Sequence, residues 1–401
     1  MINETIKTYN MKGSCVYLCS LDAEKAFDSC NWDALFKKLV EEKKIPAKIV
    51  KIISSLYKNG TAHVHYENCI SEMFRLSQGV RQGSILSPYL YNIYSELLLN
   101  TLEKETKVGT SIYDVFTGVI MYADDIILLS PTVSGLQTLV DKCTKYCNDL
   151  GVAINAGKTE FLSSGIRANP NCYLVMDHTR IHPGKSLKHL GFLWSTDHKR
   201  FLTASIEHDN IDDRLSKFWS VIYGLINAGI CFCAPHTRIS LFRSIAVPTL
   251  TYGLELCNLG ATIKNKLDCE GRRALKALFN VSRYSKNYLH SLFYLNSVST
   301  IIKKNKMNLC NRLMKNQTTK TLLLSMLKES RNSNFINGLL EDDVDILDVF
   351  MQERIVIKDN HQLPNEIRKQ LERCIKYWDL AEARWHFWKI LEEKIPVAPE
   401  N

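Results

Sequence analysis

The sequence predicts an α+β fold in its first half and an all-α region after it. Short apolar runs typical of strands alternate with helical segments up to about residue 200, and helical spacing dominates beyond that point. Hydrophobic residues make up 45% and charged residues 23% of the chain, which is the composition of a folded protein and excludes a wholly disordered one. The 401 residues suggest two or three modules.

The elements expected in the first half follow from apolar spacing and from end signals. Residues 15–22 have the pattern of a buried strand that ends at Asp22. A helix capped by Asn31 or Asp33 is expected to follow it. The further expected elements are a helix from Pro46, a hairpin of 61–66 and 71–76, a helix over 88–102, strands over 119–122 and 126–130, a helix capped by Ser134 and stopped by Gly151, and a strand over 160–163.

The second half is expected to be helical throughout. The pattern changes near 195–205, which is the best candidate for a domain boundary. We therefore expect three regions, at 1–200, 201–330 and 331–401. Their helices are expected at about 210–226, 235–247, 263–280, 297–316, 319–329 and 364–393.

Composition also excludes two classes of protein. A membrane protein is excluded because the chain has no run of about 18 apolar residues, and the nearest candidate, 119–129, contains Asp124 and Asp125. The 13 cysteines are scattered and odd in number, so we expect a reducing compartment and no disulfide-linked partner. The pairs at 143/147 and 231/233 lack a second half at zinc spacing, and buried apolar cysteines are expected at both.

Positive charge is concentrated in the middle of the chain. The formal net charge is +9. Residues 166–330 carry 24 basic and 10 acidic side chains, a net charge of +14, whereas residues 1–165 have a net charge of −1. Such a segment indicates a polyanion partner, most often nucleic acid, although a solvated basic surface is the alternative.

Three acidic residues lie where strands are expected to end. Asp124 and Asp125 separate two apolar runs at the tip of a predicted hairpin, and Asp22 ends another strand. A surface turn is the alternative explanation for the adjacent pair. Carboxylates that meet repel one another, and Mg²⁺ prefers oxygen ligands. If Asp22 and Asp124 meet in space, they would form a two-metal site for phosphoryl transfer.

Five ordered sequence blocks resemble the motifs of reverse transcriptases. The first three are 21–28 (LDAEKAFD), 79–88 (GVRQGSILSP) and 122–125 (YADD). The fourth is 151–159 (GVAINAGKT), and the fifth, 189–192 (HLGF), resembles the primer grip. Their sequences are similar to those of LINE-type enzymes of non-LTR, jockey-like retrotransposons. Residues 247–255 resemble the region after the polymerase in such elements.

The resemblance implies a right-hand polymerase. Its palm would be an antiparallel sheet with packed helices, followed by an all-α thumb and C-terminal helices. The implied activity is that of an RNA-directed DNA polymerase, a nucleotidyltransferase that adds deoxynucleoside triphosphates to a primer 3′-hydroxyl. The implied cofactor is Mg²⁺, as two ions, with Mn²⁺ as a substitute. An RNA template and a DNA primer are the implied partners, and an intracellular location in the nucleus and cytoplasm is expected.

The resemblance also implies the roles of individual residues. Asp22 and Asp124 would hold the metal ions directly, and Asp125 would support them. Phe27 would exclude a 2′-hydroxyl, the alternative being a core aromatic residue. Lys158 would protonate or neutralise the leaving pyrophosphate, the alternative being a solvated lysine beside a turn.

Two further groups of residues match binding segments of the family. Arg81, Gln82 and Gly83 match the segment along the incoming nucleotide and the template, where glycine allows a close backbone approach. Leu190 and Gly191 match the turn of the primer grip.

The chain departs from the family at its start. Complete enzymes have a fingers region before the first motif, whereas 21 residues precede Asp22 and no arginine precedes Arg75. An N-terminally truncated fragment with mostly missing fingers is therefore expected. A catalytically inactive remnant that only binds nucleic acid is the alternative function. An intron-encoded maturase is a third possibility, and the similarity of the motifs to LINE-type sequences argues against it.

Overall fold

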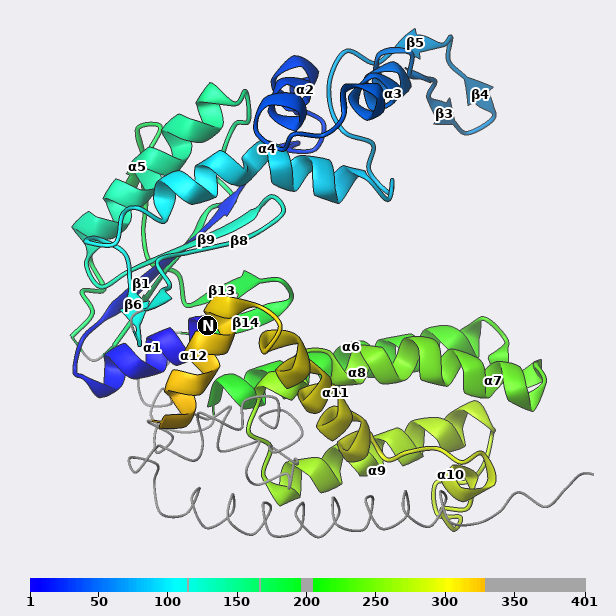
Figure 1. The fold of residues 1–401 in the computed structure, drawn as a ribbon. Helices are drawn as coiled ribbons and strands as arrows, with labels where there is room; N and C mark the ends of the chain where they lie inside the picture. Colours follow the sequence, from blue (N-terminus) through cyan, green and yellow to red (C-terminus); the bar gives the residue numbers. More distant parts are fainter. Residues whose placement is uncertain (114, 166, 196–204, 329–401) are drawn as a thin grey trace, which may run out of the picture. The chain divides into compact units, whose positions relative to one another are not determined.

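The computed structural model describes residues 1–113, 115–165, 167–195 and 205–328 (Figure 1). They belong to two compact units, Met1–Ile206 and a second that begins at Glu207. The first unit combines helices and strands, and the described part of the second is helical, as the predicted α+β class requires. The region predicted at 331–401, with its helix over 364–393, lies outside the described residues.

The first unit is built on a four-stranded antiparallel sheet of order β10-β1-β9-β8. The two central strands are buried along almost their whole length, which is why they consist of continuous apolar runs rather than alternating ones. The strands are β1 (Val16–Asp22), β8 (Val119–Tyr122), β9 (Asp125–Ser130) and β10 (Glu160–Ser164). All four were predicted to within a residue or so.

Helices cover one face of this sheet (Figure 1). Helices α4 (Ser87–Leu102) and α5 (Val133–Asp149) pack on the strands, and α2 (Trp32–Glu41) packs on α4 and on α3 (Ala47–Lys58). Asn31 is the cap of α2, because its side chain accepts a hydrogen bond from the Ala34 N–H at 3.0 Å. Cys143 and Cys147 on α5 are buried in the shared core, as predicted.

The predicted cap of α5 was wrong. The cap is Thr132, whose Oγ1 accepts from the Gly135 N–H at 3.1 Å, while Ser134 lies inside the first turn. Both residue types cap helices, so their spacing from the apolar residues did not separate them. Gly151 follows the last turn with φ +73°, which is the left-handed conformation expected of a helix stop.

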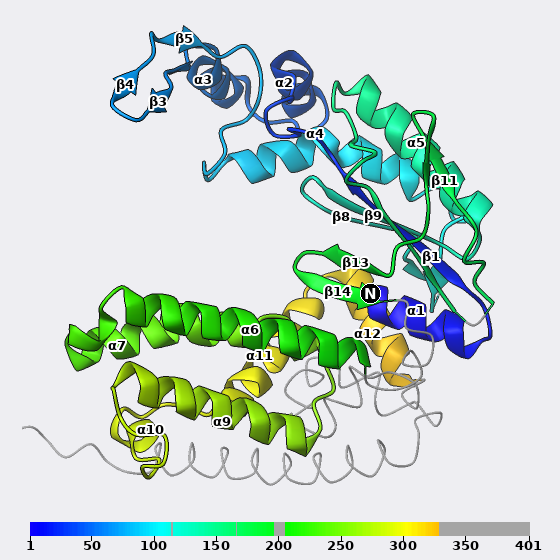
Figure 2. The same cartoon turned by 180° about the vertical axis from the view of Figure 1, so that it is seen from behind.

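Short ribbons and one helix complete the first unit. The predicted hairpin of 61–66 and 71–76 is two separate pairings, β2 with β5 and β3 with β4. Figure 2 shows β11 beside α5. The sequence analysis did not anticipate the helix α1 (Ile2–Met11) or the ribbons after β10. The ribbon strands are β2 (Thr61–Ala62), β3 (His65–Tyr66), β4 (Cys69–Ile70), β5 (Phe74–Arg75), β6 (Ser111–Ile112), β7 (Val115–Phe116), β11 (Leu174–Met176), β12 (Thr179–Ile181), β13 (Ser186–His189) and β14 (Phe192–Ser195).

The second unit is helical over its described residues. The predicted helix over 235–247 contains a π-helical turn, Phe242–Ala246, just before Pro248, which has no N–H to continue the regular hydrogen bonding. The helices are α6 (Ser205–Asn227), α7 (Pro235–Leu241), α8 (Val247–Thr251), α9 (Ala261–Leu278), α10 (Leu289–Leu292), α11 (Val298–Leu313) and α12 (Gln317–Lys328). Two single turns of 3₁₀ helix, Ile230–Phe232 and Leu254–Leu256, stand between them.

Two further properties of the described residues bear on the sequence predictions. None of their helices combines the length and the apolar character that crossing a bilayer demands. The prediction of two buried cysteines at 231 and 233 was wrong, because Cys231 is only half-buried and Cys233 is exposed. Both lie at the corner between α6 and α7, where the chain turns at the surface.

Candidate active site

The three predicted acids lie at one end of the sheet. Asp22 is the last residue of β1, and in the strand register it lies opposite Asp125, the first residue of β9. Directly opposed residues of antiparallel strands project from the same face. Asp124 occupies the adjoining loop between β8 and β9.

The loop that carries Asp124 contains only two residues. Tyr122 pairs with Asp125, so Ala123 and Asp124 alone turn the chain. Ala123 has φ +55°, a left-handed conformation that costs a non-glycine residue about 1–2 kcal/mol. The pairing of β8 and β9 on either side holds this strained turn, and with it the position of Asp124.

The carboxyl of Asp124 resists ionisation. Burial raises its pKa, and the charges of Asp125 and Asp22 raise it further, while a hydrogen bond from its own backbone acts in the opposite direction. Within the described ranges, no three His, Cys, Asp or Glu side chains are close enough to form a complete metal centre. The carboxylates still suit a hard cation that takes its other ligands from water or phosphate.

Lys158 lies beside these acids. Its Nζ is 3.4 Å from Oδ2 of Asp22, and both side chains are substantially exposed. Asn155 shapes the turn, because its Oδ1 accepts from the N–H groups of Gly157 and Lys158 at 2.9 and 3.2 Å. Its Nδ2 donates to Glu24 at 2.7 Å, and its own N–H donates to the Asp22 carbonyl at 2.9 Å. Sequence reasoning missed Asn155, although an Asn that opens a turn is a recognisable signal.

Phe27 shares a cavity with two of the acids. The cavity has a volume of about 720 Å³, lies between α4 and the β8–β9 hairpin, and is lined by Phe27, Asp124 and Asp125 among others. The Phe27 ring stacks on Tyr91 of α4, with ring centroids 4.6 Å apart and an interplanar angle of 17°. It therefore packs against the core and also faces the cavity.

The segment of the second motif runs against the segment of the first. The Gly79 N–H donates to the Cys30 carbonyl at 2.8 Å, and the Val80 N–H donates to the Phe27 carbonyl at 2.7 Å. Gly79 has φ +91°, and a Cβ there would lie 2.8 Å from the Asp28 carbonyl oxygen, so only glycine fits. Gln82 Nε2 lies 3.4 Å from both carboxylate oxygens of Asp28.

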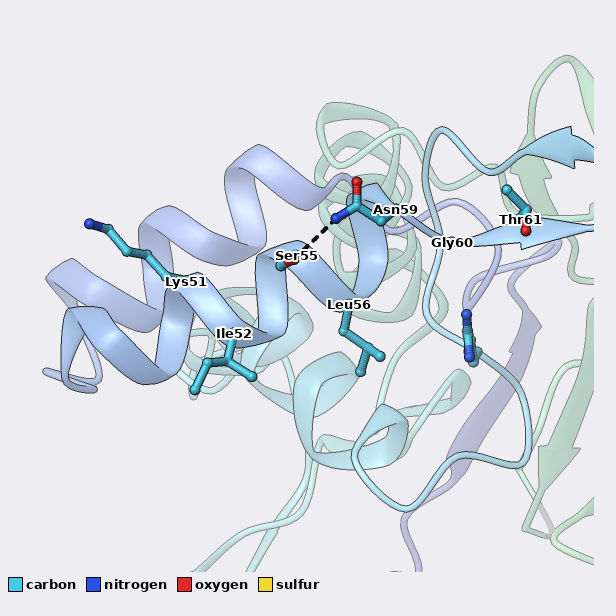
Figure 3. A pocket seen from close by; sticks show the side chains of 8 residues that line it. Lys51, Ile52, Ser55, Leu56, Asn59, Gly60 and Thr61 are labelled. Atoms are coloured by element: carbon cyan, nitrogen blue, oxygen red, sulfur yellow. Dashed lines mark hydrogen bonds between the residues drawn. The ribbon is translucent and has the colours of Figure 1, made fainter.

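Arg81 and Gly83 do not line the cavity of the acids. Arg81 lines a different one of about 700 Å³, whose α3 side carries Lys51, Ser55 and Asn59 (Figure 3). Gly83 has φ +80° and open space around its Cα. Gln82, which contacts Asp28, does not line the cavity of the acids either.

The predicted primer grip is the turn of the β13–β14 ribbon. Leu190 and Gly191 form its loop, with φ +49° and +73°. His189 is 3% exposed, and neither of its ring nitrogens has a hydrogen-bond partner among the residues that the structure describes. Burial lowers the pKa of His189, and the charge of Asp125 opposes this shift, so the ribbon lies within electrostatic reach of the acids. Sequence reasoning gave His189 no role.

Comparisons with known proteins agree with the five motifs. Residues 2–194 match the family described as "Reverse transcriptase (RNA-dependent DNA polymerase)". A Drosophila melanogaster protein, "Retrovirus-related Pol polyprotein from type-2 retrotransposable element R2DM", is 27% identical over 64% of this chain and 23% of its own length. The "RNA-directed DNA polymerase from mobile element jockey" of the same species is 26% identical over 60% of this chain and 26% of its own length.

Among solved structures, apo telomerase from Candida tropicalis is similar over 86% of this chain and 54% of its own, at 13% identity and a TM-score of 0.41. The chain spans roughly a quarter or less of the first curated relatives it matches. The predicted resemblance to non-LTR retrotransposon reverse transcriptases is confirmed.

Proposed function

We propose that residues 2–194, which match the reverse transcriptase family, carry out RNA-directed DNA synthesis. In this reaction the primer 3′-hydroxyl oxygen bonds to the α-phosphorus of a deoxynucleoside triphosphate, and the bond to pyrophosphate breaks. The observation that carries the proposal is the strand register that sets Asp22 opposite Asp125, with Asp124 in the adjoining loop.

Asp22 and Asp124 would hold two Mg²⁺ ions, or Mn²⁺ in their place, with Asp125 beside them. Such ions activate the attacking hydroxyl and stabilise the leaving pyrophosphate. Lys158 now faces the Asp22 carboxylate at 3.4 Å. Because its side chain is exposed, it is able to turn to the departing pyrophosphate and to donate a proton or neutralise its charge.

The substrate contacts are proposed from the cavity and its neighbours. Phe27, braced by Tyr91, would press against the sugar and exclude a 2′-hydroxyl. Gln82 and Gly83 would lie along the incoming nucleotide, and Arg81 would meet the RNA template. Leu190 and Gly191 would hold the DNA primer with the backbone of their turn.

We propose that residues 1–200 are a palm with partial fingers, 201–330 a thumb, and 331–401 a C-terminal helical region. The basic surplus of the middle region supports the thumb assignment, because lysines and arginines displace counterions along a phosphate backbone. We also propose that the protein acts in the nucleus and the cytoplasm.

The test is extension of a DNA primer on an RNA template with Mg²⁺ or Mn²⁺. Asp22→Asn and Asp124→Asn should each abolish extension, while Asp141→Asn, a matched change at an exposed acid on α5, should leave it intact. Full extension by both site variants would overturn the assignment. Phe27→Ala should admit ribonucleotides and Phe27→Tyr should not; unchanged sugar selectivity in Phe27→Ala would remove Phe27 from its role.

A remnant that only binds nucleic acid is the second candidate. It is favoured by the net charge of +14 over residues 166–330, which is all that binding to a polyanion requires. Steeply salt-dependent binding of template–primer without any extension would select it.

A further inference from the structure

We propose that one end of the helical unit binds single-stranded RNA by stacking its bases on exposed tyrosines. The choice of RNA as the strand rests on the proposed function. Three tyrosines between α9 and α11 carry the inference: Tyr284 is 81% exposed, Tyr288 51% and Tyr294 90%. They are called the tyrosine surface below. Tyrosine is intermediate in burial, and three exposed tyrosines in one short segment form a surface on which bases are able to stack.

The charge around this surface fits a polyanion. No Asp or Glu occurs between Glu270 and Glu329, whereas Arg283 and Lys286 lie within the segment that carries the three tyrosines. An acid-free segment with interleaved basic and aromatic side chains is typical of sites for single-stranded nucleic acid, where lysine and arginine meet phosphates and rings meet bases.

The turn that carries Tyr284 is held by hydrogen bonds to its backbone. Lys276 is buried, and its ammonium donates to the carbonyl oxygens of Arg283 and Ser285 at 3.1 and 2.6 Å. The Ser285 hydroxyl and N–H both donate to the Ser282 carbonyl, at 2.7 and 3.0 Å. The Arg283 guanidinium lies over the Tyr284 ring, 4.7 Å from its centroid. A rigid ring loses little entropy when a base stacks on it.

Tyr294 is held outward at the expense of backbone strain. Its φ of +49° is left-handed, which is unusual for a bulky residue, and strained residues cluster at binding sites. Arg243 donates to the carbonyls of Phe293 and Tyr294 at 3.0 and 3.4 Å, and the Phe293 ring packs on Phe279 with centroids 5.1 Å apart. A cavity of about 730 Å³, lined by Arg243 and Phe293, adjoins the turn.

The corner between α6 and α7 belongs to the same end of this unit. Arg238 of α7 donates to the Leu278 carbonyl at the end of α9 at 3.4 Å, and Cys231 Sγ lies 3.9 Å from the Ala277 carbonyl. Phe232, which is 93% exposed, follows Cys231. It supplies a further ring near the tyrosine surface.

An unpaired strand is the occupant that these features favour, and the proposed function identifies it as RNA. A paired duplex offers only its outermost bases for stacking, whereas an unpaired strand offers every base. In RNA-directed synthesis the strand that remains unpaired ahead of the reaction is the RNA template. An acidic peptide would satisfy the charge but would gain little from three separated rings.

The experiment uses the full chain, a fluorescently labelled unstructured RNA of mixed sequence, and anisotropy at several salt concentrations. Each lost stacking partner should weaken binding by roughly 5- to 140-fold, so Tyr284→Ala with Tyr294→Ala should weaken it at least 25-fold. The same positions changed to Phe should bind as the parent does. Tyr66→Ala, at a tyrosine that is 72% exposed in the first unit, is the matched control. A blunt RNA–DNA duplex should be bound equally by parent and variants.

Several results would overturn the inference: unchanged RNA affinity in the double Ala variant, equal losses for RNA and duplex, or equal affinity and equal losses for single-stranded DNA. Binding of an acidic peptide that competes with RNA and needs the same rings would also overturn it. Primer extension by the parent chain on an RNA template with a single unpaired nucleotide beyond the primer separates this inference from the proposed function. If the parent chain does not extend the primer but its RNA binding still requires the tyrosine rings, only the proposed polymerase activity is refuted. If it extends the primer but binds RNA equally well without the rings, only the role of the tyrosine surface is refuted.

Discussion

The close packing of Gly79 against Asp28 provides a sharp test of how the first two motifs are held together. Gly79→Ala would introduce a Cβ at 2.8 Å from the Asp28 carbonyl oxygen and 3.0 Å from its Cα, both backbone atoms. Gly83→Ala is the matched control, because Gly83 also has a positive φ but has open space where the Cβ would be.

The magnitudes follow from these two environments. Alanine at a positive φ costs about 1–2 kcal/mol, partly offset by about 0.4–1 kcal/mol from the lower entropy of the unfolded chain. This is the whole effect expected at Gly83. At Gly79 the clash adds about 1–3 kcal/mol, because the Gly79 N–H is fixed to the Cys30 carbonyl and the segment is not free to retreat.

Thermal or urea unfolding of the two variants measures the difference. Gly79→Ala should lower the free energy of unfolding by about 1–3 kcal/mol more than Gly83→Ala, which corresponds to a Tm lower by several degrees in a unit of this size. Gly79→Ala should also slow primer extension, because the displaced segment bears on Phe27. Equal destabilisation by the two substitutions would refute the close-packing argument.

Three further predictions concern the acid site. In chelator-containing buffer, Asp124→Asn should raise the Tm at neutral pH and lose this advantage as the pH falls. The folded pKa of Asp124 lies above its unfolded value, so ionisation of this carboxyl lowers the stability of the folded state as the pH rises through the folded pKa. A Tm difference that does not depend on pH would contradict this prediction. Lys158→Ala should reduce kcat for extension by roughly tenfold or more while changing stability by less than about 1 kcal/mol, because the pair with Asp22 is exposed; a large loss of Tm would assign Lys158 a structural role. Asn155→Ala should lower the free energy of unfolding by about 1–3 kcal/mol and slow extension as well. Gln137→Ala is the control, because this half-buried amide of α5 bonds to the Val175 backbone away from the acids, and its loss should lower stability but leave extension intact.

Local pattern was sufficient to predict the strands that carry the acids. The apolar runs on either side of Asp124 and Asp125 can only be buried strands, and an Asp pair between them marks a turn. The meeting of Asp22 with Asp125 was not readable in the same way. It depends on the register between strands about a hundred positions apart, and a shift of one residue would send a side chain to the other face.

The features that were missed depend on tertiary contacts. The ribbon strands β2 to β5 are two residues each, too short for an alternating pattern to be visible. Helix α1 buries Ile2 and Ile6 together with two polar residues of a mostly polar segment, so apolar residues mark only part of its buried face. His189 and Lys306 are fully or nearly fully buried although their side chains are polar, and burial of such residues follows from neighbours that only the fold supplies.

The uneven charge of the chain is explained by the opposite requirements of the two proposed tasks. A carboxylate site that takes up cations tolerates little positive charge nearby, because a lysine competes for the same oxygens, as Lys158 does at 3.4 Å from Asp22. A surface that follows phosphates requires the reverse, since unscreened carboxylates would repel the strand. The net charge of −1 over residues 1–165 and +14 over 166–330 therefore indicates two separate binding tasks rather than a generally basic protein.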